Sequence, residues 1–417
     1  MKGLLGGAPL EGTLATAGAG AGSLRRDART IGLVSAAHGL SHFYQLVLPP
    51  LFPVFRDELG VPYVALGLIM SVFYSVSAVG QTVAGFAVDR VGARVVMLMG
   101  LGCVSSAMAL ASAATAYWML LPVAVLGGLG NCVFHPADYA LLNAGVSPAR
   151  LGRAYSLHSL CGNVGWILGP AVIIALSSQL GWRGALLTVG VTGLVAAGLL
   201  ASPTGTLPDH REGGEVDLAG AAGSATGLRI LATAPILMAF AYFAFLSMSL
   251  VGLKTFGVPA MVTLYGVAVS FAANALTAYL LGNAAGIVAG GALADRVRRH
   301  DVVAVSGMGL ASLLALVLAG AVAPGGWLPL LMGATGFCMG LTQPSRDLIV
   351  RAATPPRAAG KVLGFVYSGL DLGSTVTPLA FGFLLDRGAP RAVFGVSAAL
   401  MVVTMLTVLR VRALAGR

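Results

Sequence analysis

Charged residues are scarce in this sequence, and aromatic residues are few. Of its 417 residues only 10% are charged and 7% are aromatic, whereas 57% are apolar. A soluble globular chain carries about 25% charged residues and about 45–50% apolar ones. The shortage of charge therefore excludes an ordinary soluble protein of two or three domains, which the length alone would suggest.

The sequence also lacks the patterns of several kinds of functional site. Its four cysteines lie inside apolar runs and form no C-x-x-C pair, so we interpret them as packing residues: Cys103, Cys132, Cys161 and Cys338. No P-loop, H-E-x-x-H or G-x-S-x-G motif is present, which argues against an ATP-driven pump and against a membrane-embedded enzyme. The net charge of +10 comes from scattered single basic residues, not from a nucleic-acid-binding stripe. We expect no enzymatic activity, no cofactor and no nucleic-acid partner.

Apolar runs of about 20 residues recur from residue 30 to the end of the chain. Runs of this length are candidates for transmembrane helices, and their continuity argues against a membrane β-barrel. The sequence therefore predicts an all-α integral membrane protein with twelve transmembrane helices. We place them at approximately 30–55, 62–88, 94–114, 117–143, 154–178, 183–202, 235–258, 268–293, 302–323, 328–352, 362–385 and 391–410.

The predicted helices fall into two groups of six, separated by a charged, glycine-rich segment. We expect a disordered cytoplasmic tail (1–29), a six-helix bundle (30–202), a cytoplasmic linker (203–229) and a second six-helix bundle with a tail (230–417). Cytoplasmic loops of membrane proteins carry an excess of lysine and arginine. With both termini inside, 20 of the 25 basic residues fall on the cytoplasmic side. We therefore predict a multi-pass protein of the inner (plasma) membrane with both termini cytoplasmic.

The two halves also repeat one another in sequence. A shift of 208 residues gives six matches, among them Gly165 with Gly373 and Pro170 with Pro378. The repeat runs in the same direction in both halves, and each half has an even number of helices. This is the parallel repeat expected of a transporter built from two six-helix bundles.

Two loops at equivalent places in the halves carry related motifs. The first reads Gly85-Phe-Ala-Val-Asp89-Arg90-Val-Gly92-Ala-Arg94, and the second reads Gly291-Ala-Leu-Ala-Asp295-Arg296. Both are similar to the G-x-L-A-D-R-x-G signature of the major facilitator superfamily, whose members are secondary transporters. The resemblance implies a conformational latch made of Gly85, Asp89, Arg90, Gly92, Arg94, Asp295 and Arg296.

The physics of the latch follows from the helix dipole. The N-terminal end of helix 362–385 presents partial positive charge on the cytoplasmic side, and Asp89 faces it if Gly85 permits close approach. Asp295 would face helix 154–178 in the same way. We therefore expect these two loops to stabilise one conformation of the protein.

Glycines and one short motif add to the resemblance. Gly162-x-x-Gly165-x-x-x-Gly169-Pro170 is similar to the glycine–proline motif seen in antiporters of that superfamily. Small residues at four-residue spacing predict close helix packing in helix 268–293, at Gly282, Gly286 and Gly290. The segment Phe134-His135-Pro136 resembles the fosmidomycin-resistance group, and this resemblance implies export of a small compound.

Ionisable side chains inside the predicted helices are candidates for function, because a charge in the bilayer interior costs several kcal/mol. Apart from arginines at their ends, they are absent from the third helix of each triplet (94–114, 183–202, 302–323 and 391–410), which the superfamily resemblance places against lipid. His158 and Asp347 lie in predicted helices but receive no role. We assign the substrate and proton pathway to His38, His42, Gln45, His135, Asp138, Lys254, Arg346 and Asp371.

His38, His42 and Gln45 recur at i, i+4 and i+7, so they share one helix face. Histidine changes charge near neutral pH, and we expect these residues to carry protons; the alternative is that they only make packing hydrogen bonds. We expect no metal site, because no cysteine or carboxylate accompanies the two histidines at ligand spacing along the chain.

For the other charged residues the sequence leaves two possible roles open. Asp371 either carries a proton or forms a permanent ion pair with Arg346. Lys254 either extends to the membrane surface or binds the anionic group of a solute. Asp138 and Arg346 are 208 residues apart, so the repeat places them at equivalent positions, and we hypothesise an ion pair that forms only when the cytoplasmic side closes.

These observations predict a secondary active transporter of a small organic solute that works by alternating access. We expect protons as the coupling ion, export as the direction, and a monomer in the bilayer. The alternative is proton-coupled uptake of a small organic anion such as a carboxylate.

Overall fold

The computed structural model describes residues 11–202, 232–294, 296, 297, 299–353 and 359–415, and within these ranges every regular element is a helix. The first bundle contains α1 (Glu11–Gln45), α2 (Phe52–Leu59), α3 (Tyr63–Val91), α4 (Ala93–Ala111), α5 (Leu120–Asn131), α6 (Phe134–Gly145) and α7 (Leu151–Ala201). The second contains α10 (Ala234–Lys254), α11 (Gly257–Tyr265), α12 (Val269–Ala294), α13 (His300–Gly320), α14 (Leu328–Ala353), α15 (Ala359–Asp386) and α16 (Pro390–Ala415). The expected linker 203–229 lies outside the described residues.

The first membrane helix differs from the sequence prediction at both ends. Residues 11–29, expected to be part of a disordered tail, form the start of α1; their five alanines favour a helix, although four glycines lie among them. At the other end the predicted helix 30–55 is broken after Gln45, and a short 3₁₀ turn over Pro49–Leu51 precedes α2. Pro49, Pro50 and Pro53 have no backbone N–H, so they cannot continue the hydrogen-bond ladder of α1.

Two further predicted helices are divided in the structure. Helix 117–143 consists of α5 and α6, with Cys132 and Val133 between them. Pro136 in the first turn of α6 cannot donate a hydrogen bond to Cys132, which favours a break at this point. Likewise helix 235–258 ends at Lys254, and α11 begins at Gly257.

Eight stretches of the described residues are long and apolar enough to cross a membrane, judged by length and composition. The longest runs from Pro148 to Ala201 and has 54 residues. At 1.5 Å per residue a straight helix of that length would measure about 80 Å, far more than the roughly 30 Å of a bilayer core. Gly181 divides it, with a φ of +68° that reverses the chain between two antiparallel spans.

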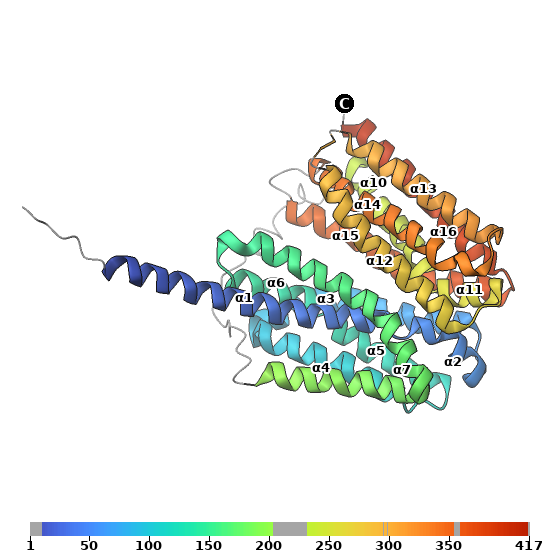
Figure 1. The fold of residues 1–417 in the computed structure, drawn as a ribbon, viewed down its shortest axis with the longest axis horizontal. Helices are drawn as coiled ribbons and strands as arrows, with labels where there is room; N and C mark the ends of the chain where they lie inside the picture. Colours follow the sequence, from blue (N-terminus) through green and yellow to red (C-terminus); the bar gives the residue numbers. More distant parts are fainter. Residues whose placement is uncertain (1–10, 203–231, 295, 298, 354–358, 416–417) are drawn as a thin grey trace, which may run out of the picture.

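The helices pack as two bundles that lie side by side (Figure 1). Within the second bundle α12 and α14 approach each other closely, as the glycine spacing predicts. A Cβ on Gly286 would lie 2.9 Å from the backbone nitrogen of Leu341, and one on Gly340 would lie 2.9 Å from that of Ile287. Since real Cβ atoms do not approach backbone so closely, only glycine permits this contact.

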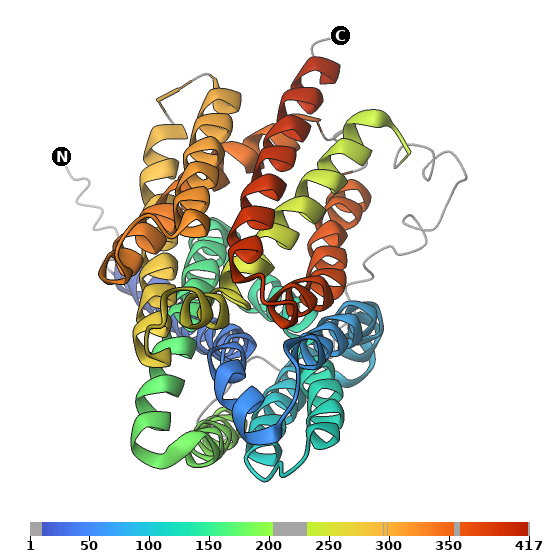
Figure 2. The same ribbon diagram turned by 90° about the vertical axis from the view of Figure 1, so that its right-hand side faces the viewer.

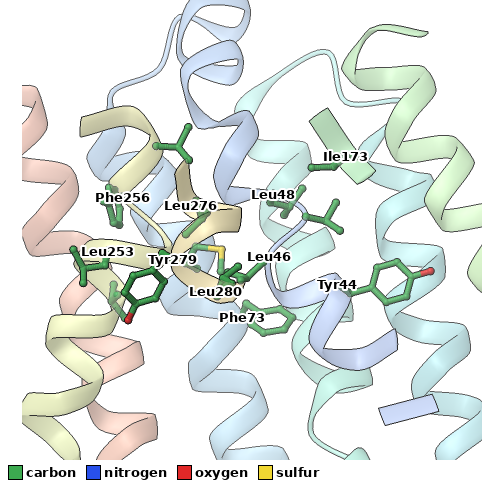
Figure 3. Close-up of a cluster of buried hydrophobic side chains, with 14 of the residues drawn as sticks. Tyr44, Leu46, Leu48, Phe73, Ile173, Leu253, Phe256, Leu276, Tyr279 and Leu280 are labelled. Carbon is green, nitrogen blue, oxygen red and sulfur yellow. The ribbon is translucent and has the colours of Figure 1, made fainter. Parts of the chain in front are cut away.

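The two bundles meet at the end of the molecule where α2 and α11 lie, which we call the junction end (Figures 1 and 2). There the rings of Phe52 and Phe256 are 5.8 Å apart. The buried apolar cluster drawn in Figure 3 continues across the boundary, with Leu46 and Phe73 from the first bundle and Leu280 from the second.

Towards the opposite end, a cavity of about 510 Å³ separates α7 from α12. Tyr155, Ser159 and Asn163 of α7 and Ala284 and Ile287 of α12 are among the residues that line it. We call this cavity the inter-bundle cavity. The molecule is therefore closed at the junction end and hollowed at the other.

Candidate functional site

A row of glycines on α7 allows α1 to pack against it and positions the site. Gly162, Gly165 and Gly169 recur at intervals of three and four residues, so they share one face. A Cβ on Gly165 would lie 2.9 Å from the carbonyl carbon of Gly39, and one on Gly169 would lie 2.8 Å from the carbonyl oxygen of Phe43. The backbones of α1 and α7 are therefore nearly in contact.

Three polar side chains from three helices meet beside this contact. His38 Nδ1 lies 2.9 Å from Oδ2 of Asp138, and His158 Nε2 lies 3.1 Å from the same oxygen. The side chains are 3%, 0% and 2% exposed for His38, Asp138 and His158, respectively. The two imidazoles stack with their centroids 3.6 Å apart. One carboxylate oxygen thus accepts hydrogen bonds from two buried histidines, and we call these three residues the triad.

Two more histidines surround the triad. The ring of His42 lies 4.4 Å from that of His38, and the ring of His135 lies 5.4 Å from it. His135 is exposed and lies against Tyr139, which in turn contacts Tyr155, a residue that lines the inter-bundle cavity. Four of the six histidines of the chain therefore gather around Asp138, and aromatic side chains connect them to the cavity.

A chain of hydrogen bonds extends from the other side of this cluster. The indole N–H of Trp166 donates to Gln45 (3.0 Å), Gln45 donates to Asn131 (2.9 Å), and Asn131 donates to Ser77 (2.8 Å). The Trp166 ring also lies 4.4 Å from the ring of His42. Four helices are thus joined through one polar network next to the triad.

Lys254 reaches this network from the second bundle. Its Nζ lies 3.8 Å from the centroid of the Trp166 ring, a cation–π contact. Among the described residues no carboxylate pairs with Lys254 and no hydrogen bond is formed by its ammonium group. It therefore does not extend to the membrane surface in this structure but lies in the boundary between the bundles.

The remaining charges in the second bundle lie apart from the triad. The guanidinium of Arg346 lies 5.1 Å from the centroid of the buried Phe243 ring. Asp371 on α15 is partly buried, and the described residues show no ion pair between it and Arg346. The structure therefore does not contain the permanent Arg346–Asp371 pair considered above.

Asp138 and Arg346, hypothesised to form a switching ion pair, do not meet. Asp138 points into its own bundle, and its Oδ2 is occupied by the two histidines. The sequence repeat gives equivalent positions along helices but not the direction of a side chain, and in Asp138 that direction is set by hydrogen bonds within the bundle. In this conformation Asp138 is therefore engaged within its own bundle, and the switching pair, expected only when the cytoplasmic side closes, stays a prediction.

The latch residues lie at the end opposite the junction. Asp89 and Arg90 are exposed, and no described residue forms a hydrogen bond or ion pair with Asp89. A Cβ on Gly85 would meet nothing within 4 Å, so the close approach expected there is absent in this structure. Gly92 has a φ of +97°, a conformation that favours glycine.

Arg94 donates to the carbonyl oxygen of Ala201 at 2.9 Å and so caps the end of α7. Arg296 is exposed. Asp295 lies outside the described residues. The latch itself stays a prediction.

The triad is also the group of described residues best placed to hold a metal ion, since its ligand atoms lie within 4.8 Å of one another. The sequence argued against a metal because no carboxylate lies near the two histidines along the chain. That argument is wrong for the folded protein, because Asp138 of another helix lies beside His38. The two nitrogen–oxygen distances are nevertheless ordinary hydrogen-bond lengths. In this structure the contacts of the triad are therefore hydrogen bonds, and its three side chains also provide the donor set of a metal site.

The sequence reasoning counted His158 among the ionisable residues of the predicted helices but gave it no role, and it missed Trp166 and Asn131 as site residues. A signal for His158 was present, because it lies four residues before Gly162 and continues the glycine face that packs on α1. Trp166 and Asn131 carry no charge, so a search for ionisable residues passed over them. Their roles depend on contacts between helices.

The comparisons with known proteins agree with this architecture. The chain matches the family model of the Major Facilitator Superfamily over residues 34–268 and 255–415. The fosmidomycin resistance protein of Escherichia coli K12 is 24% identical over 398 residues, which cover 94% of this chain and 95% of that protein.

Solved transporters share the fold as well. A bacterial homolog of the human lysosomal transporter Spinster, in an inward-facing and occupied conformation, superposes with a TM-score of 0.72 at 15% identity, covering 94% of this chain and 97% of the other. The nucleoside transporter NupG superposes with a TM-score of 0.71 at 15% identity, covering 92% and 98%. From the family match along nearly the whole length and the two-bundle fold, we conclude that this chain belongs to the major facilitator superfamily.

Proposed function

We propose that this protein exports a small organic solute across the inner membrane in exchange for protons. Its family and fold make it a multi-pass membrane transporter of a small solute, and we propose that it works by alternating access. Coupling to protons and the direction of transport are the parts that we propose.

The observation that carries proton coupling is the buried triad of His38, Asp138 and His158. A lone carboxylate inside a bilayer is costly, and a neighbouring imidazolium neutralises it. The triad thus has two states: neutral overall when one histidine is protonated, and negative when neither is. Histidine suits such an exchange because its imidazole can be either neutral or protonated.

The side chains between the inter-bundle cavity and the triad support a proton route from that cavity. Tyr155 lines the cavity, its ring lies 5.5 Å from Tyr139, and Tyr139 lies 5.6 Å from His158. His135, which is exposed, lies next to His38. With both termini in the cytoplasm, as the distribution of basic residues favours, the cavity opens to the cytoplasm and protons carried inward are released there.

Export is favoured by the relative that matches nearly the whole chain and is named for resistance to fosmidomycin. Resistance to a toxic compound is readily explained by its removal from the cell. We extend the proposal to the bundle boundaries 30–202 and 230–417, with the segment 203–229 as a cytoplasmic linker, and to a functional monomer.

Uptake of a small organic anion is the second candidate, and Lys254 is the observation that favours it. Its ammonium group lies against the Trp166 ring between the bundles, and among the described residues no carboxylate pairs with it. A carboxylate of a solute would neutralise it there. This alternative predicts that Lys254→Met abolishes solute binding, whereas export of a neutral compound predicts little change.

Proteoliposomes test the proposal. The purified full chain is reconstituted with a pH-sensitive dye inside, and fosmidomycin is the first solute to add, followed by small carboxylates. Solute-dependent proton movement opposite to the solute supports exchange, and movement in the same direction supports uptake with protons. Asp138→Asn should abolish this movement, while Asp57→Asn, at an exposed acid on α2, should not.

The metal alternative is tested on the same protein. A titration with Zn²⁺ that shows tight binding lost in Asp138→Asn, together with transport that requires Zn²⁺, would contradict the proton role of the triad. Proton movement that persists at the parent rate in Asp138→Asn would contradict it as well.

A further inference from the structure

The first turn of α3 takes its hydrogen-bond partner from the other bundle. The first four N–H groups of a helix have no partner within it, and a side chain at the N-cap position usually accepts from them. Here the N-cap residue is Pro62, which provides no such acceptor. Asp386, the last residue of α15, accepts instead from the N–H of Tyr63 through Oδ1 (2.7 Å) and from the N–H of Val64 through Oδ2 (2.8 Å).

The position of these bonds gives them their significance. Tyr63 and Asp386 belong to different bundles and are 323 residues apart in sequence. They lie at the junction end, where α3 begins and α15 ends. The carboxylate is 19% exposed and meets the positive end of the α3 dipole, and Arg56 lies 3.8 Å from it.

Two glycines bring the helices close enough for this contact. A Cβ on Gly382 would lie 2.6 Å from the carbonyl oxygen of Tyr63. A Cβ on Gly67 would lie 2.8 Å from the carbonyl carbon of Pro378. The ends of α3 and α15 are thus built to lie against each other, and the two hydrogen bonds fix them in register.

We propose that Asp386 is a clasp that holds the junction end closed and is released each time the transporter opens there. Alternating access requires the two bundles to separate at this end, and the hydrogen bonds from Tyr63 and Val64 to Asp386 cannot survive that separation. The clasp exists in one state only, so it shifts the balance of states towards the one seen here. The proposal goes beyond proton coupling and holds for export and for uptake alike.

The same contact explains how opening is kept reversible. When the clasp is released, the first N–H groups of α3 and the Asp386 carboxylate meet water at the membrane surface. Both groups are then solvated, so the free energy lost on opening is moderate and comparable to that of removing a helix cap. We expect Asp386→Ala to raise the ratio of open to closed molecules about tenfold, which is about 1.4 kcal/mol.

Distances between spin labels at the junction end measure this ratio. The labels are placed at Asp57 on α2 and at the exposed Val322 beyond α13, in a full-length chain whose four native cysteines are replaced. The parent should give mainly the short distance. In Asp386→Ala the longer distance should be about tenfold more populated than in the parent. Asp386→Asn keeps the shape of the side chain without its charge, and its population of the longer distance should lie between those of the parent and Asp386→Ala.

A second variant separates a clasp from a simple helix cap. Pro62→Ser supplies α3 with its own N-cap, so the double variant Pro62→Ser with Asp386→Ala should recover helix stability but keep the enlarged open population. An unchanged distance distribution in Asp386→Ala would overturn the proposal. So would a double variant that restores the closed state, because Asp386 would then act only on the helix. Neither result depends on whether protons move, so the test stands apart from that of the proposed function.

Discussion

The contact between α1 and α7 supports the triad, and Gly165→Ala is the change that tests this support. The new methyl group would lie 2.9 Å from the carbonyl carbon of Gly39 and 3.0 Å from the backbone nitrogen of Phe43. Non-bonded carbon atoms prefer about 3.5–4.0 Å. The nearest atom is the carbonyl oxygen of Gly39, which the methyl group would overlap. Because these neighbours are all backbone, none can rotate away, and α1 must move from α7 by about 1 Å or more.

The size of the effect follows from this displacement. Inserting a methylene into a packed interface costs about 1–3 kcal/mol, and exchanging glycine for alanine within a helix returns about 0.5–1 kcal/mol. The net loss of stability should thus lie between about 0 and 2.5 kcal/mol, towards the upper end because the overlap is with backbone atoms. Since His38 is next to Gly39, the same movement lengthens the 2.9 Å bond from His38 to Asp138 beyond hydrogen-bond range.

Two measurements check the prediction, with Gly152→Ala as a matched control on the same helix. A Cβ on Gly152 would meet nothing within 4 Å, so the control should gain up to about 1 kcal/mol in unfolding free energy and transport normally. Gly165→Ala should lose stability in the same denaturant titration and lose most of its solute-dependent proton movement. Equal behaviour of the two variants would refute the role of this contact in positioning the triad.

Two other changes probe contacts outside the triad. The hydrogen bond from Ser147 is the largest influence that holds the pKa of Asp27 below its ordinary value. The stability that Asp27 contributes is therefore present above the ordinary pKa of about 3.9 and is lost as the pH falls through the lower pKa of the folded state. In a plot of unfolding midpoint against pH, Asp27→Asn should flatten the fall at acid pH, and an unchanged fall would contradict this. Gln45→Leu leaves the Trp166 N–H and the Asn131 side chain without their hydrogen-bond partner, which should reduce the unfolding free energy by about 1–3 kcal/mol. A loss below about 0.5 kcal/mol would show that this chain of hydrogen bonds contributes little to stability.

The fold followed from the sequence because membrane helices are long and apolar. The bilayer thickness fixes their length, so continuous apolar runs predict spans with few alternatives. The sequence predicted the breaks within these helices less well. Pro49 and Pro50 are visible in the sequence as helix breakers, yet the prediction continued the helix through them, and the division between α5 and α6 was missed although Pro136 marks it.

For the candidate site, the sequence predicted the types of residue but not their arrangement in space. His38, His42, His135 and Asp138 were all expected to be functional, and the structure brings them together. Their meeting depends on helix rotation, which a single sequence does not specify when nearly all surfaces are apolar. The sequence therefore did not indicate that Asp138 forms hydrogen bonds with side chains of α1 and α7.

The clasp at Asp386 was beyond sequence reasoning for a different reason. Asp386 ends an apolar helix and resembles any solvated acid at a membrane surface. Its partners are backbone N–H groups, which every residue except proline possesses, so no pattern of side chains indicates them. Only the three-dimensional proximity of α3 and α15 reveals the bond.

The central claim is that the triad couples solute movement to protons, and Asp138→Asn separates the two most directly. Asparagine keeps an oxygen that accepts from both histidines, so the helices should stay in place while the negative charge is lost. In proteoliposomes loaded with the transported solute, the variant should still exchange labelled for unlabelled solute, which needs no net proton. It should fail to accumulate solute when a pH gradient is imposed. Accumulation driven by the pH gradient at the parent level would contradict the account.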